Sequence, residues 1–476
     1  MLFSEPSFVF FFLPAVLLAY FLVGSRARDY VLLAFSLGFY AWGERVYVLV
    51  LCVSILLNWA CGLAAGRSAG ASRAPVVAAV VGNLLLLVGF KYTNFLVENF
   101  NVFLGGWGLR PLRVPRVHLP IGISFFAFQG MSYVIDVHRR ACPPQRSLIK
   151  LAMYKSFFPQ LIAGPIVRYV DVAPQIESRT VTLDGFTEGI RRFTLGLGKK
   201  MIIANVVARP TDLIFALPAS QLSGGLAWIG IVGYALQIYF DFSAYSDMAI
   251  GLGRMFGFRF LENFDYPYVA TSMTEFWRRW HISLSSWFRD YLYIPLGGNR
   301  VSSGRRMLNL LVVFLLCGLW HGASWSFVVW GLFHGVFLIL ERVRALQVLR
   351  APWRIVRHAY VLLVVLVSWV FFRADDLSTA LGFLRALAGG AHPTQVVPGV
   401  RMFVDAQVVG AALLGAVGSA PVFPALRRWF ERVSDGGSRA AGPLEAARLA
   451  GVLGVFIYAV SLMAAGSYSP FIYFRF

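Results

Sequence analysis

The sequence predicts an all-α integral membrane protein, a single polytopic domain over residues 1–476 in which several helices span the bilayer. The composition is 58% hydrophobic and 14% charged, whereas soluble domains carry roughly 25% charged residues. Apolar runs reach about 15 to 20 residues, close to the length that a helix needs to cross a hydrocarbon core about 30 Å thick. These continuous runs, among them VVAAVVGNLLLLVGF, lack the alternation that is typical of a transmembrane β-barrel.

The formal charge of +20 lies in short arginine clusters between the apolar runs. This pattern is typical of cytoplasmic loops and anionic lipid headgroups, so we expect membrane lipids and no nucleic acid as partners. Placing each cluster in the cytoplasm puts both the N-terminus and the C-terminus on the extracytoplasmic side. The four cysteines form no CxxC pair, so neither a disulfide framework nor a metal site is predicted.

The order of clusters and apolar runs predicts the individual spans. The first run follows Glu5 and precedes Arg26 and Arg28, the reverse of a secretory signal peptide, so it should remain as the first span. Spans are expected over 8–23, a pair across 30–66, a pair ending near 137, a hairpin between 306 and 342, and single spans over 360–372, 404–420 and 450–465. Residues 387–446 form a loop and span region with no recognised motif.

Two regions do not fit simple spans. Residues 147–205 are interrupted by FFPQLIAGPIVRYV, and residues 266–300 are too charged and too rich in tryptophan to cross lipid alone. Both are predicted to be re-entrant or interfacial. Because non-helical backbone at membrane depth must be buried in protein or line a watery cavity, the breaks at Pro159, Gly164 and Pro165 predict a central tunnel within about a dozen membrane elements.

Two histidines lie in strongly apolar or aromatic sequence: His281 in FWRRWHISLSSWFRDYLYIPLGGNR and His321 in CGLWHGASWSFVVWGLFHG. An ionisable side chain at membrane depth suggests function, although a neutral imidazole hydrogen-bonded inside a bundle would have the same sequence. Helical rise from Met307 carries His321 roughly 20 Å from the cytoplasmic face. Gly318 and Gly322 are expected to allow a helix break and close approach by a substrate.

Other polar side chains in apolar sequence favour structural roles. Asp241 and Asp247 in YFDFSAYSD could serve a proton path, but an ion pair with Arg254 is the favoured interpretation. His334, a few turns beyond His321, is expected to pack or hydrogen-bond within the hairpin.

Four stretches together resemble the membrane-bound O-acyltransferase (MBOAT) family and, within it, the alginate O-acetylation membrane proteins: LPIGISFFAFQGMSYVIDV, YFDFSAYSDMAIGLGRMFG, RRWHISLSSWFRDYLYIPLGGNR and the WHG of CGLWHG. The resemblance extends through WVFFRADDLSTAL and resumes at SPFIYFRF. It implies a helical bundle of the MBOAT type around a central tunnel in the bacterial cytoplasmic (inner) membrane. It also implies transfer of an acyl group, expected to be acetyl, from a cytoplasmic thioester across the membrane for O-acetylation of an exopolysaccharide such as alginate.

The resemblance also assigns residues. His321 matches the active-site histidine of the family, and His281 matches its second histidine. A neutral imidazole suits removal of the proton from an acceptor hydroxyl, so His321 is the expected base. The positive charge of Arg278, Arg279 and Arg289 would leave His281 as a neutral donor or orienter of the thioester. These arginines are also candidates for binding donor phosphates, although ordinary cytoplasmic positive bias explains them equally well.

The expected acyl donor is acetyl-CoA or an acyl carrier protein thioester, with no tightly bound cofactor. The family resemblance implies periplasmic acetyltransferase proteins of a polysaccharide-modification complex as partners. Two other classes remain open. A polysaccharide or lipid transporter or flippase is weakened because the chain lacks two matching halves. A noncatalytic membrane scaffold of an acetylation complex would use the histidines structurally.

The C-terminal residues 467–476 are predicted to form an extracytoplasmic aromatic tail, SYSPFIYFRF. Such a tail fits an interfacial aromatic belt. The alternative is an acyl relay, in which His321 takes the phenol proton of Tyr473 and the tyrosine carries the acetyl group as an aryl ester. The family resemblance supports this alternative, because small aromatic C-terminal segments act as acyl carriers in the related D-alanylation machinery for teichoic acids.

Overall fold

Every regular element of the computed structural model is helical across the residues that the structure describes: 1–68, 71–343, 345–346, 351–391, 393–422, 424–426, 428, 432 and 441–466. Within these residues, seven helical stretches are long and apolar enough to cross a membrane. They are Arg28–Ser68, Ala74–Gly106, Gly224–Met255, Ser303–His321, Trp325–Arg342, Arg354–Arg373 and Glu445–Ala464. The predicted all-α membrane class is confirmed. The tail 467–476, with Tyr473, lies outside the described residues.

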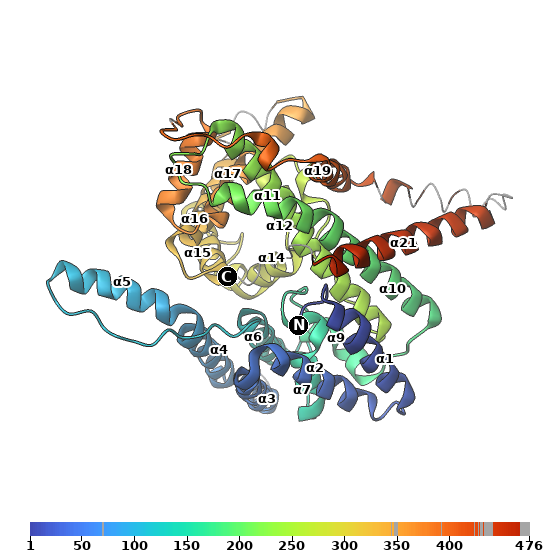
Figure 1. The fold of residues 1–476 in the computed structure, drawn as a ribbon. Coiled ribbons are helices and arrows are strands. Elements are labelled where there is room, and N and C mark those ends of the chain that lie inside the picture. Colours follow the sequence, from blue (N-terminus) through green and yellow to red (C-terminus); the bar gives the residue numbers. More distant parts are fainter. Residues whose placement is uncertain are drawn as a thin grey trace.

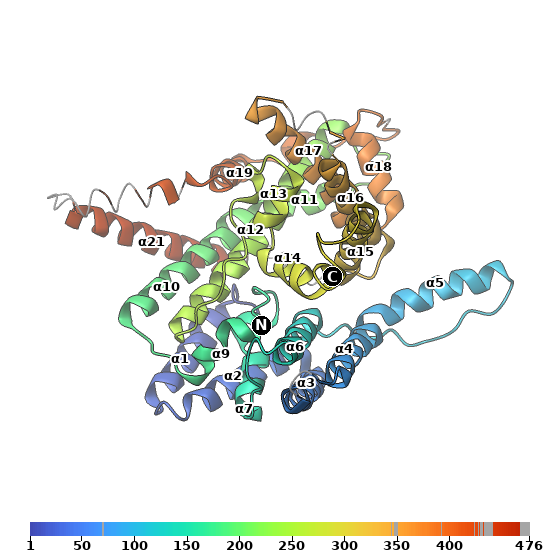
Figure 2. The same ribbon diagram turned by 180° about the vertical axis from the view of Figure 1, so that it is seen from behind.

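The N-terminal elements group on one side of the molecule, apart from a projecting α5 (Figures 1 and 2). They are a π-helical turn at Phe8–Phe12, α1 (Leu13–Leu22), α2 (Arg28–Glu44), α3 (Val48–Ser68), α4 (Ala74–Leu87), α5 (Thr93–Gly106) and α6 (Ile123–His138). The predicted pair of spans across 30–66 is confirmed. Arg45 separates α2 from α3 with a φ of 46°, a left-handed conformation that ends α2.

The interrupted region contains three short helices: α7 (Leu148–Ser156), α8 (Phe158–Leu161) and α9 (Tyr169–Glu177). Between α8 and α9, residues 162–167 are not helical and are buried inside the protein. Gly164 lies against the backbone of Pro159, where a Cβ atom would come within 2.8 Å of the carbonyl oxygen. The break expected at Gly164 and Pro165 is thus present, whereas Pro159 lies in the first turn of α8, two residues after the break at Phe157. Protein surrounds the irregular backbone at 162–167, as a position in the membrane requires.

Helix α12 (Gly224–Met255) runs through the middle of the molecule between the two groups of helices (Figure 1). It is the most enclosed of the candidate spans, with 72% of its apolar window buried. α10 (Leu183–Gly198) and α11 (Asn205–Phe215) pack along it, joined by a π-helical turn at Lys199–Ala204. A helix that is apolar around most of its circumference is expected in the interior rather than against solvent.

The carboxylates of α12 pair with the π-helical turn rather than with Arg254. Asp241 lies 2.6 Å from the Lys200 ammonium, and Asp247 lies 2.6 Å from the Lys199 ammonium. Arg254 instead pairs with Glu188 of α10 at 3.2 Å. Both carboxylates form ion pairs, as expected, but the expected partner Arg254 is wrong. Residue spacing along α12 could not show that the π-helical turn would bring Lys199 and Lys200 beside it.

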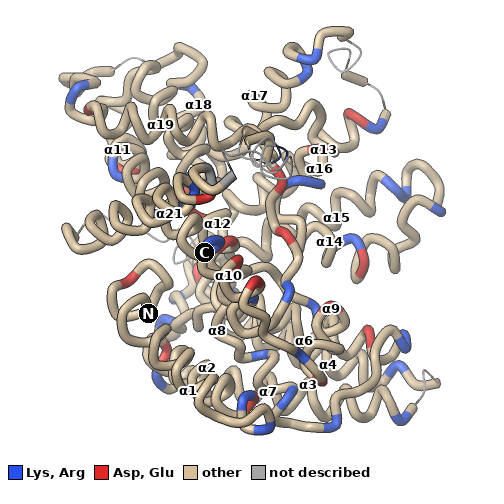
Figure 3. The backbone as a smooth tube through the Cα atoms, turned by 90° about the vertical axis from the view of Figure 1, so that its right-hand side faces the viewer, with Lys and Arg blue, Asp and Glu red and all other residues tan. Residues whose placement is uncertain are grey.

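The C-terminal half contributes the helices around the other end of α12 and one helix, α21 (Ala441–Ala464), that packs along α10. Its helices are α13 (Met273–Arg279), α14 (Ile282–Phe288), α15 (Ser303–His321), α16 (Trp325–Arg342), α17 (Arg354–Arg373), α18 (Leu377–Leu387), α19 (Ala406–Gly418) and α21 (Ala441–Ala464). The predicted hairpin is α15 and α16, and residues 266–300 form short helices rather than one continuous span. Their re-entrant or interfacial position stays a prediction. The tube in Figure 3 shows most charged residues at helix ends and in connections, with an exception where α10 meets α12.

Candidate active site

His321 is the last residue of α15 and is 5% exposed. The carbonyl groups of this final turn have no partners within the helix. Lys91 supplies them: its ammonium donates to the carbonyl oxygens of Trp320 and of His321, the latter at 3.1 Å, and to Ser124 Oγ at 3.3 Å. The Tyr92 hydroxyl donates to Leu319 O at 2.6 Å. A cation and a phenol from the turn between α4 and α5 therefore hold the end of the histidine-bearing helix.

Two cavities adjoin this helix end. The first, of about 390 Å³, is lined by His321, Trp320 and Lys91 together with residues 118–125. The second, of about 330 Å³, lies beside the turn at Gly322 and the end of α17. Lys91 and Leu119 line both cavities, so these two side chains form a shared wall next to His321.

His281 occupies the turn between α13 and α14 and is completely buried, with 0% exposure. Its φ of 43° lies in the left-handed region, which is costly for a residue with a Cβ atom and tends to occur at functional sites. The centroid of its ring lies 6.3 Å from that of His321 and 6.0 Å from that of Trp320. The fold thus brings together two histidines that are predicted from separate motifs.

Four ring nitrogens in and around this pair have no hydrogen-bond partner among the described residues: His281 Nε2, His321 Nδ1, Trp320 Nε1 and Trp330 Nε1. Buried polar groups in proteins are normally hydrogen-bonded, and an unpartnered group calls for a specific explanation. His321 and Trp320 line the first cavity, and the fully buried ring of His281 lies 6.3 Å and 6.0 Å from their rings. Such a place is suited to a substrate that completes the missing hydrogen bonds.

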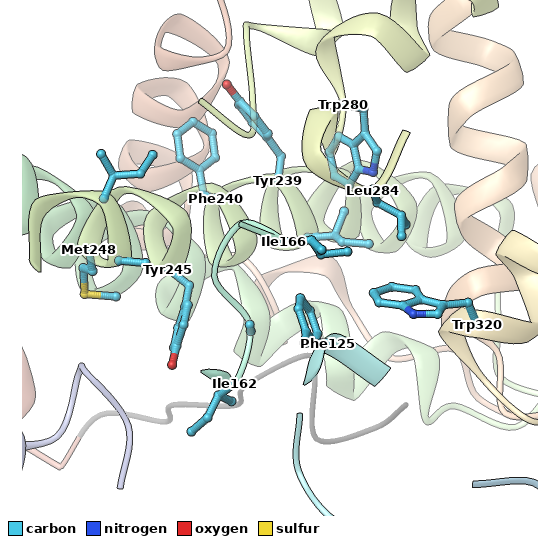
Figure 4. Packing of buried hydrophobic residues seen from close by; sticks show 14 of the residues in the cluster. Phe125, Ile162, Ile166, Tyr239, Phe240, Tyr245, Met248, Trp280, Leu284 and Trp320 are labelled. Atoms are coloured by element: carbon cyan, nitrogen blue, oxygen red, sulfur yellow. The ribbon is translucent and has the colours of Figure 1, made fainter. Parts of the chain in front are cut away.

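Aromatic side chains enclose the histidine pair. The rings of Trp330 and Phe372 lie 5.1 Å and 5.2 Å from the His321 ring. Phe125 packs edge-on against Trp320 at 5.3 Å, and Figure 4 shows these two side chains facing one another near Leu284. A wall of rings limits the access of water and strengthens the electrostatic interactions inside it.

The three arginines predicted around His281 have other positions. Arg279 pairs with Asp265 at 2.9 Å and Glu275 at 3.1 Å, and Arg289 pairs with the neighbouring Asp290. Arg278 is exposed and has no acidic partner in the described part of the chain. The ring contacts of His281 are with Phe242, Trp320 and His321. The positive charges of Arg279 and Arg289, which were expected to act on His281, are balanced by carboxylates.

The two glycines beside His321 both lie close to Phe327 of α16. A Cβ atom at Gly318 would overlap the carbonyl oxygen of Phe327, and one at Gly322 would overlap the Phe327 ring. The expected helix break is present at Gly322, which follows the last residue of α15 and also lines the second cavity. Approach of a substrate at these glycines stays a prediction. His334 packs in the hairpin as expected, where the Trp277 indole donates to its Nδ1 at 3.3 Å.

Sequence reasoning missed Lys91 and Asn263, which lie next to the histidines. Lys91 had a usable signal, because it follows the apolar run VVAAVVGNLLLLVGF and is an ionisable residue at membrane depth. Asn263, whose Oδ1 lies 3.1 Å from His281 Nδ1, had none. It sits in an irregular segment 18 positions away, and only the tertiary fold brings it to the ring.

The fold and the site define a polytopic membrane protein with an enclosed histidine pair, one member of which, His321, lines a cavity. Residues 124–378 match the model of the membrane-bound O-acyltransferase family, MBOAT. The chain belongs to this family and is a membrane O-acyltransferase.

Relatives cover most of the chain or all of it. A protein of Azotobacter vinelandii named "probable alginate O-acetylase AlgI" is 40% identical, with all of both chains covered. A protein of the same name from Pseudomonas putida is 41% identical with the same coverage. The peptidoglycan O-acetyltransferase of Helicobacter pylori is 36% identical, over 82% of this chain and 80% of that protein.

Proposed function

We propose that this chain moves an acetyl group from a thioester donor in the cytoplasm across the inner membrane, for O-acetylation of an exopolysaccharide such as alginate. The observation that carries the proposal is the histidine pair with its unpartnered ring nitrogens, in which His321 lines a cavity and the His281 ring lies 6.3 Å from it. The names of full-length relatives support acetyl as the group and alginate as the polymer. The name of the peptidoglycan O-acetyltransferase also supports acetyl as the group, but it names a different polymer.

His321 acts as the base. Its imidazole takes the proton of the acceptor hydroxyl while the hydroxyl oxygen attacks the carbonyl carbon of the thioester. The carbon–sulfur bond then breaks, and the proton passes from the imidazole to the sulfur of the departing thiol. The aromatic enclosure supports this step, because it keeps water from hydrolysing the thioester while the reacting groups are held together.

Acetyl-CoA or an acyl carrier protein thioester is the proposed donor. Periplasmic acetyltransferase proteins would carry the acetyl group onward, and both termini would lie on their side of the membrane. Arg278 is the best placed of the three predicted arginines for a donor phosphate, since it is exposed and Arg279 and Arg289 are already paired with carboxylates.

The substitution His321→Ala tests the proposal in a deletion strain that carries the gene for each variant. We expect loss of acetyl esters from the surface polymer, measured by mass spectrometry, with unchanged protein in the membrane. His358→Ala is the matched control, because His358 of α17 lines neither cavity beside His321 and its ring forms a hydrogen bond with Ala270 O. Normal acetylation in the His321 variant would favour a scaffold. Substrate accumulation without consumption of thioester would favour a transporter.

A further inference from the structure

A set of hydrogen bonds surrounds the side chain of Asn263, which is 1% exposed. Its Oδ1 lies 3.1 Å from Nδ1 of His281. The same oxygen accepts hydrogen bonds from the Ser283 backbone N–H at 3.2 Å and from the Ser283 hydroxyl at 2.8 Å. The amide nitrogen donates to Ser246 Oγ of α12 at 3.1 Å. One side chain therefore joins the central helix to the turn that carries His281.

These hydrogen bonds show which atoms of the network donate and which accept. A backbone N–H can only donate, so the Asn263 atom that faces Ser283 N–H is the carbonyl oxygen. The Ser283 hydroxyl accepts from the Ile166 N–H at 3.0 Å, which leaves its own proton for Asn263. The Ser283 oxygen also lies 3.5 Å from Nδ1 of His281, but its one hydroxyl proton is used in the shorter 2.8 Å bond to Asn263. Since an amide oxygen has no proton to offer, Nδ1 of His281 carries the hydrogen of its bond to Asn263.

The other ring nitrogen then has a defined state. Nε2 of His281 is buried and has no partner among the residues described. A proton on Nε2 would give a charged ring with a buried N–H group that nothing accepts, which is costly. The buried ring is therefore neutral, and Nε2 holds a bare lone pair in the cluster that contains His321.

We propose that Asn263 is a positioning residue that fixes His281 in the tautomer with hydrogen on Nδ1, so that Nε2 accepts a hydrogen bond from the substrate. This inference rests on the proposed function and deepens it. In this tautomer Nε2 cannot donate, so the donor role expected for His281 is replaced by that of an acceptor. An orienting hydrogen bond of this kind fixes the tautomer of catalytic histidines generally.

Groups that could alter the charge of His281 are few. From α15 the ring of His321 faces it, and Lys91 lies at the end of that helix. From α12 come the uncharged Phe242 and, through Asn263, Ser246. On the segment of His281 itself, the ion pair of Arg279 with Asp265 lies beside the turn. A carboxylate introduced at position 263 would thus be the one acidic group in direct contact with the ring among the described residues.

The test compares Asn263→Leu, Asn263→Asp and His281→Ala in membrane vesicles. Acetyl-CoA with cytosolic extract, which supplies acyl carrier protein, serves as the donor probe, and initial rates are measured over donor concentration and pH. Asn263→Leu removes the acceptor of the Nδ1 hydrogen, so we expect kcat to fall about tenfold or more while KM for acetyl-CoA stays within about twofold. Asn263→Asp keeps an acceptor oxygen and should recover activity at mildly alkaline pH.

The pH profile separates positioning from a purely structural role. A carboxylate favours the protonated ring, so Asn263→Asp should move the low-pH limb of kcat to higher pH. Asn83→Leu is the matched control for lost stability. Asn83 is fully buried and makes a similar number of hydrogen bonds, but with Asn58 and Ser54 in the contact of α3 and α4. We expect it to retain wild-type kcat and pH dependence.

Normal kcat in Asn263→Leu, or an unchanged low-pH limb in Asn263→Asp, overturns the inference. If Asn263→Leu does not fold, the pH profile of Asn263→Asp decides alone. An inactive His281→Ala beside an active Asn263→Leu would refute the role of Asn263 and leave the proposed function standing. A fully active His281→Ala would remove His281 from the proposed function itself.

Discussion

The unpartnered nitrogens of His281 and His321 are the residue-level feature on which the chemistry depends. Each belongs to a ring that packing holds in place, yet His281 Nε2 and His321 Nδ1 have no hydrogen-bond partner among the described residues. An unmade hydrogen bond in a buried site costs about 1–3 kcal/mol. A substrate that supplies the missing partner recovers this free energy where the reaction takes place.

A buried ion pair at the residue scale gives a prediction about stability. Lys200 and Asp241 are 3% and 2% exposed in their side chains. Asp241→Ala leaves an uncompensated charge and should destabilise the protein by about 3–5 kcal/mol. The double variant Lys200→Met, Asp241→Leu should recover most of the loss, because it removes both charges. Thermal unfolding in detergent measures the difference, and equal stability of the single and double variants would refute the argument.

The proposed relay at Tyr473 is tested by a change of one hydroxyl group. Tyr473→Phe keeps the ring and removes the oxygen that would carry the acetyl group. If the relay operates, polymer acetylation should fall to the level of His321→Ala while the protein remains in the membrane. Unchanged acetylation would leave the tail as an interfacial aromatic belt.

At the scale of elements, the crossing of α15 and α16 depends on glycine. A Cβ atom at Gly318 would overlap the carbonyl oxygen of Phe327, and one at Gly331 would overlap that of Phe314. Gly318→Ala should force the helices apart and cost about 1–3 kcal/mol, with reduced activity because His321 is on the displaced end. Gly304→Ala in the same helix meets no atom within 4 Å and is the control. Similar unfolding temperatures for the two variants would contradict the close crossing.

The end of α15 gives a second prediction at this scale. Lys91→Met removes the ammonium from the carbonyl groups of Trp320 and His321, so the last turn should fray and acetyl transfer should fall. Lys155→Met is a matched control, since Lys155 is also buried, lines neither cavity, and within the described part of the chain donates its hydrogen bonds to Ser54. Transfer rates in vesicles are measured beside unfolding temperatures. Equal rates for both variants would refute a special role of Lys91.

The helices themselves were largely predictable from the sequence, because membrane length and the absence of water leave the backbone few choices. The hairpin of α15 and α16 and the interrupted backbone at 162–167 are examples. The pairing of side chains between elements was less predictable. Asp241 forms an ion pair with Lys200 rather than with Arg254, because a partner on another element depends on the packing of the whole fold.

At the scale of the whole molecule, the site forms where segments far apart in the chain meet. His321 comes from α15, His281 from the turn between α13 and α14, and Lys91 from the turn between α4 and α5. The sequence predicted both histidines as site residues, because each is an ionisable residue in apolar sequence. It could not predict Asn263, because the contact of Asn263 with His281 exists only in the assembled fold.

The most direct test of the account follows the acetyl group itself in membrane vesicles that contain the wild-type protein or His321→Ala. Radiolabelled acetyl-CoA with cytosolic extract supplies the thioester, and both the release of free thiol and the formation of labelled acetyl esters are measured. The account predicts that the wild type produces both together and that the folded His321→Ala protein produces neither above background, a loss of about 100-fold or more. Ester formation at the wild-type rate in the His321→Ala vesicles would contradict it.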